Sequence, residues 1–343
     1  TQCCESISSV NLEYRKGRCL IVSPFFYGLN ISMEIQKLHV EPSSHCNARC
    51  PGCPRNLNGY NVDDLFNKTH LTAERFGEVL EQYPEVNFLL FNGNLGDPMM
   101  NPDILSLVDV ARHVYELRIN TNGSIGKLET FERLGAMKNI IISFGIDGLE
   151  DTNHLYRQDV EWEKIMERAK KFIGAGGRAE WKFILFRHNQ HQVEEARSLS
   201  QELGFKKFEV VDHSRNNFPA LNRDGTVSHW VLPAEMDTVV DQKRDHSGAN
   251  RQDKFDLEQR LDEIREVRKT FHVNKSYKTF DCEHLREKSV YVSATGELFP
   301  CCYQGIGVPT LGKKPLSEFD ELKDTWNTGS PDYMCGAVCG RNS

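Results

Sequence analysis

Short runs of apolar residues alternate with amphipathic segments between residues 35 and 212. The runs are rich in β-branched residues, which is typical of strands that are buried on both faces of a parallel sheet. The segments between them carry apolar residues at helical spacing, with Thr72 placed as an N-cap of the first and Gly204 just after the last. The predicted strands span Lys37–Val40, Asn87–Phe91, Glu116–Asn120, Asn139–Ile146, Glu180–Phe186 and Lys207–Val211, and the predicted helices span Thr72–Gln82, Pro102–His113, Leu128–Met137, Val160–Ile173 and Gln192–Leu203.

This order of elements predicts an α/β fold. Six strands joined by five helices imply right-handed βαβ units and a parallel sheet. Six units are too few for a complete eight-stranded barrel. We therefore expect a partial (β/α)6 TIM-like barrel, with its functional loops at the carboxyl ends of the strands.

The pattern changes twice beyond the barrel. Residues 241–270 mix acidic and basic side chains while their apolar residues keep helical spacing, which predicts either a solvated connector helix or a lid over the substrate. From residue 276 onward, cysteines, glycines and short predicted strands indicate a small domain stabilised by metal. The predicted regions are an N-terminal extension (1–34), the barrel (35–215), a charged helical connector (216–275) and a cysteine-rich domain (276–343).

The composition is that of an ordinary globular protein. The 343 residues are 39% hydrophobic and carry a formal net charge of −7. No apolar run is long enough to span a bilayer, and no signal sequence opens the chain. No dense stripe of Lys and Arg suggests a nucleic-acid partner. We therefore expect a cytoplasmic protein that binds neither membranes nor nucleic acids.

The 11 cysteines fall into distinct groups. An odd number without a secretory signal argues against a disulfide framework. Three cysteines lie close together directly after the first predicted strand, namely Cys46, Cys50 and Cys53. Five more lie in the last 62 residues, namely Cys282, Cys301, Cys302, Cys335 and Cys339. Because no cysteine lies between these groups, two separate metal sites are the simplest explanation.

The front cysteines have the spacing CxxxCxxC. Three thiolates do not close a structural zinc site, but in a [4Fe–4S] cluster they leave one iron open to another ligand. In this position the loop resembles the radical S-adenosylmethionine (SAM) superfamily. The resemblance implies that Cys46, Cys50 and Cys53 hold the cluster and that its open iron binds SAM. Electron transfer would then cleave SAM to a 5′-deoxyadenosyl radical, which abstracts a substrate hydrogen. Gly52 departs from the family pattern, which usually has an aromatic residue there, and a zinc loop is the alternative.

Polar residues at later strand ends also resemble motifs of this family. The glycine-rich loop 92–98 resembles the GGE or GEP motif that holds the ammonium group of SAM, although by itself it reads as a turn. The resemblance implies that polar strand-end residues bond the ribose hydroxyls and the methionyl carboxylate, and that Arg157 or Lys182 supplies a cation for the carboxylate. The candidate cofactor-binding residues are Gly93, Asn94, Gly96, Asp97, Asn122, Ser143 and Arg157.

The C-terminal cysteines resemble a reduced SPASM domain. The C-x13-G-x4-C pattern that begins at Cys282 is similar to the opening of that domain, and the small number of cysteines points to the shorter twitch form. The resemblance implies one auxiliary [4Fe–4S] cluster, and a zinc ribbon is the alternative. Cys302 would be left free beside the cluster, as a catalytic hydrogen donor, as an exchange partner of Cys301 or as a buried thiol. The ligands would be Cys282, Cys301, Cys335 and Cys339.

The resemblance covers residues 35–215 and 276–343. It implies an enzyme of the oxidoreductase or isomerase type that takes electrons from a donor such as flavodoxin or ferredoxin. The favoured substrate is a peptide or protein side chain, oxidised with the help of the auxiliary cluster. Three alternatives stay open: a dehydrogenase or epimerase of an aminoglycoside or other sugar-type small molecule, a non-catalytic iron–sulfur sensor, and a zinc-stabilised scaffold.

Overall fold

The computed structural model describes residues 11–15, 18–22, 35–57, 59–61, 68–211, 218–235, 279–280, 282–306, 316–318, 335 and 340–341. The chain divides into two compact units, Thr1–Glu34 and Ile35–Ser343. The first unit contains an antiparallel hairpin of β1 (Asn11–Arg15) and β2 (Arg18–Val22), which the sequence pattern did not predict. The second unit contains every other described element.

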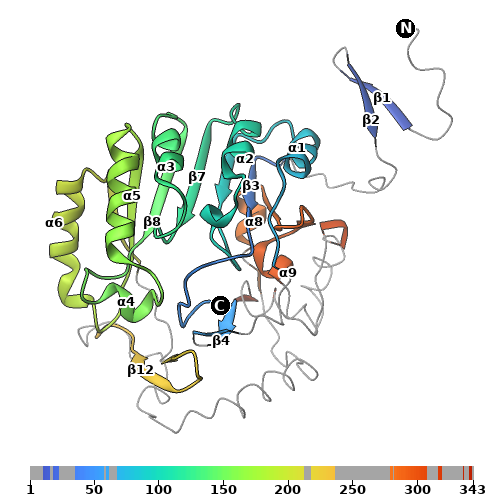
Figure 1. Cartoon of the computed structure of the whole chain (residues 1–343). Coiled ribbons are helices and arrows are strands. Elements are labelled where there is room, and N and C mark those ends of the chain that lie inside the picture. Colours follow the sequence, from blue (N-terminus) through green and yellow to red (C-terminus); the bar gives the residue numbers. More distant parts are fainter. Residues whose placement is uncertain are drawn as a thin grey trace. The chain divides into compact units, whose positions relative to one another are not determined.

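The second unit is built on an eight-stranded sheet with the strand order β10-β9-β8-β7-β6-β3-β14-β15 (Figure 1). The first seven strands in this order pair in parallel, and β15 pairs antiparallel with β14. The strands are β3 (Lys37–Val40), β6 (Phe88–Phe91), β7 (Glu116–Thr121), β8 (Ile140–Gly145), β9 (Arg178–Ile184), β10 (Lys207–Val211), β14 (Ser289–Val292) and β15 (Leu298–Phe299). The predicted parallel sheet with the six βα-linked strands is therefore confirmed, with ends that differ by two residues or fewer.

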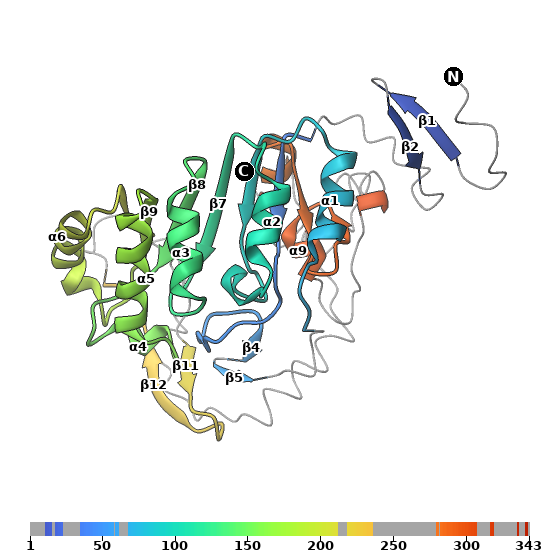
Figure 2. The ribbon, with the colours of Figure 1, turned by 45° about the horizontal axis from the view of Figure 1, so that its top comes forward.

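Helices cover one face of this sheet (Figures 1 and 2). The connecting helices are α1 (Ala73–Gln82), α2 (Ile104–Val110), α3 (Leu128–Gly135), α4 (Asn153–Tyr156), α5 (Trp162–Gly174) and α6 (Val193–Leu203), with short 3-10 turns at Pro98–Met100 and Gln190–Gln192. Helix α1 begins after Thr72, whose Oγ1 accepts the backbone N–H of Arg75 at 3.2 Å. Helix α6 ends at Gly204 in the left-handed conformation, with φ of 89°. Both predicted caps are therefore confirmed.

The two faces of the sheet differ in chemistry. On the helix side, Phe144 of β8 packs between Phe131 of α3 and Phe172 of α5, with ring centroids 6.1 and 6.4 Å apart. Because side chains alternate along a strand, the neighbours of these apolar residues face the other side. There Arg118 of β7 forms an ion pair with Glu180 of β9 across the intervening strand. The face of the sheet opposite these helices therefore carries charged side chains on β7 and β9.

The region predicted as a helical connector contains an antiparallel hairpin. Strands β11 (Phe218–Leu221) and β12 (Val227–Val231) form it, so the prediction is wrong for these residues. Aromatic and β-branched residues on either side of the turn at Asn222–Gly225 favour strands. The helical spacing within 241–270 lies outside the described residues.

The C-terminal segment contributes β14 and β15 to the main sheet, so that β14 lies directly beside β3. The remaining described elements are the β4–β5 hairpin (Asn56–Leu57, Tyr60–Asn61), β13 (Thr279–Phe280) paired with β16 (Gly340–Arg341), α8 (Glu283–Arg286), α9 (Cys302–Ile306) and a 3-10 turn at Leu316–Glu318. Among the residues that the structure describes, no helix is both long enough and apolar enough to cross a membrane.

Candidate functional site

The three-cysteine loop leaves the carboxyl end of β3, where parallel α/β folds place their functional groups. Cys50 is buried, and Cys46 and Cys53 are half-buried. Burial raises the pKa of Cys46 to about 12. Burial also raises the pKa of Cys50, against the opposing effect of the Arg157 charge. The thiols of Cys46 and Cys50 therefore hold their protons more tightly than an ordinary cysteine does, and metal binding has to displace those protons.

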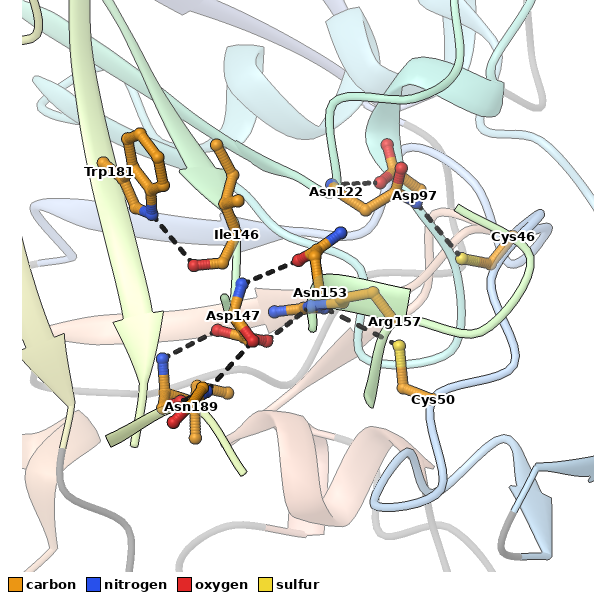
Figure 3. A network of polar contacts seen from close by, with 11 residues as sticks. Cys46, Cys50, Asp97, Asn122, Ile146, Asp147, Asn153, Arg157, Trp181 and Asn189 are labelled. Carbon is orange, nitrogen blue, oxygen red and sulfur yellow. Dashed lines mark hydrogen bonds and ion pairs between the residues drawn. The ribbon is translucent and has the colours of Figure 1, made fainter. Parts of the chain in front are cut away.

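Asn122 connects the end of β7 to this loop (Figure 3). Its Nδ2 donates to Oδ1 of Asn47 at 2.9 Å and lies 3.8 Å from Sγ of Cys46. Its Oδ1 accepts the backbone N–H of Ser124 at 2.9 Å. The structure thus brings one predicted cofactor residue into contact with a predicted cluster ligand.

Asp97 is buried and joins loop 92–98 to the same strand end. Its carboxylate accepts the hydroxyl of Thr121 at 2.8 Å, the backbone N–H of Asn122 at 2.8 Å and that of Met99 at 2.9 Å. Burial raises its pKa, while these donors act in the opposite direction. The carboxylate therefore already holds two parts of the site together, and direct contact with SAM stays a prediction.

Glu41 is a site residue to which the sequence analysis gave no role. It directly follows β3, is 1% exposed, and its Oε1 accepts the backbone N–H groups of Leu95 at 2.6 Å and Gly96 at 2.9 Å. Tyr291 of β14 donates its hydroxyl to Oε2. Loop 92–98 packs directly against the backbone that follows β3, because a Cβ at Gly96 would collide with the carbonyl oxygen of Ser43. A carboxylate directly after a buried parallel strand was the signal that could have identified Glu41.

Arg157 lies beside the cysteine loop, as Figure 3 shows. Its Nε donates to Oδ2 of the fully buried Asp147 at 2.6 Å, and its Nη1 lies 3.8 Å from Sγ of Cys50. Oδ1 of Asp147 accepts the backbone N–H of Ile184 at 2.7 Å, which fixes the carboxylate. The other predicted cation, Lys182 on β9, lies close enough to Glu209 of β10 to influence its pKa.

Several buried polar atoms near the strand ends have no hydrogen-bond partner among the described residues. They include Oγ of Ser143, Nδ2 of Asn94 and Oδ1 of Asn120. Such atoms in a folded protein call for a partner, and they fit a polar ligand such as SAM. In the described part of the chain, no group of three or more His, Cys, Asp or Glu side chains could hold a metal ion. In a cubane cluster each thiolate binds a different iron, so the three cysteines need not converge on one ion.

The C-terminal cysteines are partly described. Cys282 precedes α8, Cys301 and Cys302 lie at the start of α9, and Nε2 of Gln304 lies 3.7 Å from Sγ of Cys335. Burial raises the pKa of Cys301 to about 12, and Cys335 adds to the effect. Burial raises the pKa of Cys302 to about 11, with contributions from Glu283 and Glu41. Cys335 therefore contacts Gln304 of α9, and its charge acts on Cys301, just before that helix.

Cys339 lies outside the described residues, so the auxiliary site stays a prediction.

The barrel matches the sequence model of a known family, and two curated proteins are similar to parts of the chain. The sequence model of the Radical SAM superfamily matches residues 40–199. PqqA peptide cyclase of Gluconobacter oxydans is 26% identical over 221 residues, which cover 62% of this chain and 58% of that protein. The tungsten-containing aldehyde ferredoxin oxidoreductase cofactor-modifying protein of Pyrococcus furiosus is 30% identical over 117 residues, 33% of this chain and 31% of that protein. The chain thus spans less than two thirds of the length of these curated relatives.

Solved structures share the fold over most of the chain. SuiB of Streptococcus suis bound to SAM superposes with a TM-score of 0.54 at 18% identity, over 89% of this chain and 68% of that one. SuiB bound to its precursor peptide SuiA gives a TM-score of 0.51 at 17% identity, over 90% and 67% of the two chains. The CxxxCxxC loop at the end of β3 lies within residues 40–199, the part of this chain that matches the Radical SAM superfamily.

Proposed function

We propose that this chain is a radical SAM enzyme that cleaves SAM reductively and oxidises a side chain of a peptide or protein. The observation that carries the proposal is the loop of Cys46, Cys50 and Cys53 at the carboxyl end of β3, within the superfamily match. A [4Fe–4S] cluster bound there supplies the electron that breaks a carbon–sulfur bond of SAM. A one-electron donor such as flavodoxin or ferredoxin supplies that electron in turn.

The chain's own residues hold and orient these groups. Glu41 fixes loop 92–98 through two backbone N–H groups, so that the loop keeps one shape when the ammonium group of SAM arrives. Asn122, directly after β7, and Arg157, directly after α4, contact two cysteines of the loop. The buried Ser143 and the half-buried Asn94 each carry a buried polar atom, Oγ and Nδ2, that SAM would satisfy.

The first test is SAM cleavage by the reconstituted protein. With SAM and dithionite under anaerobic conditions, we expect 5′-deoxyadenosine to form, and Cys50→Ala to form none. Cys19→Ala is the matched control, because Cys19 lies on β2 in the other unit and its loss should leave the product unchanged. If Cys50→Ala keeps the activity of the native chain, the proposal is wrong at its centre.

A peptide substrate is supported by relatives and by the sheet itself. One relative is a peptide cyclase, and SuiB has been solved with its precursor peptide SuiA bound. The face of the sheet opposite the helices carries the ion pair of Arg118 and Glu180 with Glu116 beside it, which suits a polar chain better than an apolar ligand.

The substrate class can be tested by hydrogen transfer. The loaded protein is given SAM, a reductant and an extract of cells grown in heavy water, and deuterium in 5′-deoxyadenosine is measured by mass spectrometry. For a peptide donor, prior protease treatment of the extract should abolish the deuterium signal. If the signal survives protease and follows the small-molecule fraction, a sugar-type substrate replaces the peptide.

An auxiliary [4Fe–4S] cluster in the C-terminal segment is supported by the closeness of Cys301 and Cys335 at α9. Cys282 and Cys339 would complete a closed site of four thiolates. Two clusters predict about eight irons per chain, falling to about four in Cys301→Ala and staying near eight in Cys302→Ala. Equal losses in the two variants would contradict this assignment.

Cys302→Ala would then isolate the predicted catalytic role of that thiol. If Cys302 returns a hydrogen atom to the substrate, this variant keeps both clusters and SAM cleavage but loses the final product.

A further inference from the structure

Arg55 lies inside the three-cysteine loop. It follows Cys53 by two residues, and its side chain folds back so that Nη2 donates to the carbonyl oxygen of Ala48, between Cys46 and Cys50. The residue is 7% exposed, and its Nε is a buried donor without a hydrogen-bond partner. The guanidinium is thus enclosed by the loop with part of its donor capacity unused.

Arg55 differs from the other two arginines at this site in its countercharge. Arg49 pairs with Asp159 at 2.7 Å, and Arg157 pairs with Asp147 at 2.6 Å. Among the described residues, no carboxylate forms an ion pair with Arg55. A guanidinium stays protonated in a protein, and a buried charge without a partner is strongly destabilising. The loop is therefore built around a positive charge that calls for an anion.

The anionic groups available in this loop are the thiolates of its three cysteines. The charge of Arg55 acts on Cys46 and lowers the pKa of that thiol, against the larger opposing effect of burial. When the three cysteines bind a [4Fe–4S] core they do so as thiolates, and the assembly carries a net negative charge that grows when it accepts an electron. A fixed positive charge beside it favours the reduced state.

We infer that Arg55 is the countercharge of the front cluster and raises its reduction potential. The inference rests on the proposed function, because it needs a cluster on Cys46, Cys50 and Cys53. Arg55 is in this role a positioning residue: it bonds no iron, and it acts through the field that it places on the cluster and through its bond to Ala48.

The test is a redox titration of the anaerobically reconstituted full chain, with the reduced cluster followed by electron paramagnetic resonance. Arg55→Gln should shift the midpoint potential of the front cluster to more negative values. Arg55→Lys keeps the charge and should lie between Arg55→Gln and the native chain. Arg49→Gln is the matched control: it removes the same charge from the same loop, but one that Asp159 already neutralises, so the shift should be much smaller.

Each outcome decides the matter. If Arg55→Gln loads iron and keeps the native potential, or shifts it no more than Arg49→Gln does, the inference is wrong. If Arg55→Gln fails to load iron while Arg55→Lys loads it, the positive charge is required and the inference stands. If both variants fail, the bond to Ala48 shapes the loop and the electrostatic role is refuted. A native chain that loads no front cluster would instead refute the proposed function, before any variant is compared.

Discussion

The contact between Tyr291 and Glu41 joins the C-terminal segment to loop 92–98, and Tyr291→Phe tests what this contact contributes. The change removes one hydroxyl and keeps the ring, which packs against His39 and Phe299. Both partners of the lost hydrogen bond are 1% exposed, so water does not replace it. Oε2 of Glu41 is then left without this donor while Oε1 keeps its two backbone donors.

The expected loss follows from the kind of bond. A hydrogen bond to a charged group contributes about 1.5–3 kcal/mol, and leaving a buried acceptor unsatisfied costs a similar amount. We therefore expect Tyr291→Phe to lower the free energy of unfolding by about 2 kcal/mol. Tyr115→Phe is the matched control, since Tyr115 is 74% exposed and its hydroxyl should contribute less than about 0.5 kcal/mol.

Urea unfolding, followed by circular dichroism and tryptophan fluorescence, measures both variants against the native chain. A double-mutant cycle with Glu41→Gln separates the bond itself from side effects of each change, and a coupling energy of about 1 kcal/mol or more is expected. The reasoning is refuted if Tyr291→Phe loses no more stability than Tyr115→Phe, or if the cycle shows no coupling.

Three further predictions concern the same unit. Gly96→Ala should collide with the carbonyl of Ser43, so we expect loss of SAM binding in equilibrium dialysis with the iron content retained. Asp147→Asn leaves the half-buried Arg157 without its fully buried carboxylate partner and should lower the free energy of urea unfolding by about 3 kcal/mol, and an unchanged value would contradict the pairing. Burial and neighbouring histidines lower the pKa of His188 to about 4 from 6.5, so the unfolded state binds its proton first as pH falls. Stability should therefore decline on acidification from about pH 6.5 to pH 4, with a shallower slope in His188→Gln.

The barrel could be predicted from the sequence because the pattern that specifies each strand or helix lies within a few consecutive residues. Each strand is a short apolar run and each helix an amphipathic segment, so the spacing of residues such as Leu117 and Ile119 reports burial without any knowledge of neighbours. The front cysteines were found for the same reason, since their spacing lies within eight residues. The β11–β12 hairpin was missed because charged residues around it drew the region into a predicted helix.

The contacts that shape the site could not be predicted in this way. Glu41 and Tyr291 are 250 residues apart, and they meet because β14 pairs in parallel with β3. A four-residue strand gives no sign of its partner, because alternation reports which face is buried and not what lies alongside. The role of Arg55 could not be predicted for a related reason. An arginine in a loop is usually exposed, and only the fold of the loop shows that this side chain is buried and bonded to Ala48.

The position of β14 gives the C-terminal segment a structural role within the main sheet. Its residues Val290, Tyr291 and Val292 are each at most 1% exposed, so this strand is interior to the sheet rather than an appended edge. Helix α9, which begins at Cys302, packs so closely on β14 that a Cβ at Gly305 would collide with the Tyr291 ring. A continuous series of contacts therefore runs from α9 to Tyr291, from there to Glu41, and through two backbone hydrogen bonds to loop 92–98 at Leu95 and Gly96. The segment that carries the second group of cysteines is thus part of the same sheet as β3, the strand from which the three-cysteine loop begins.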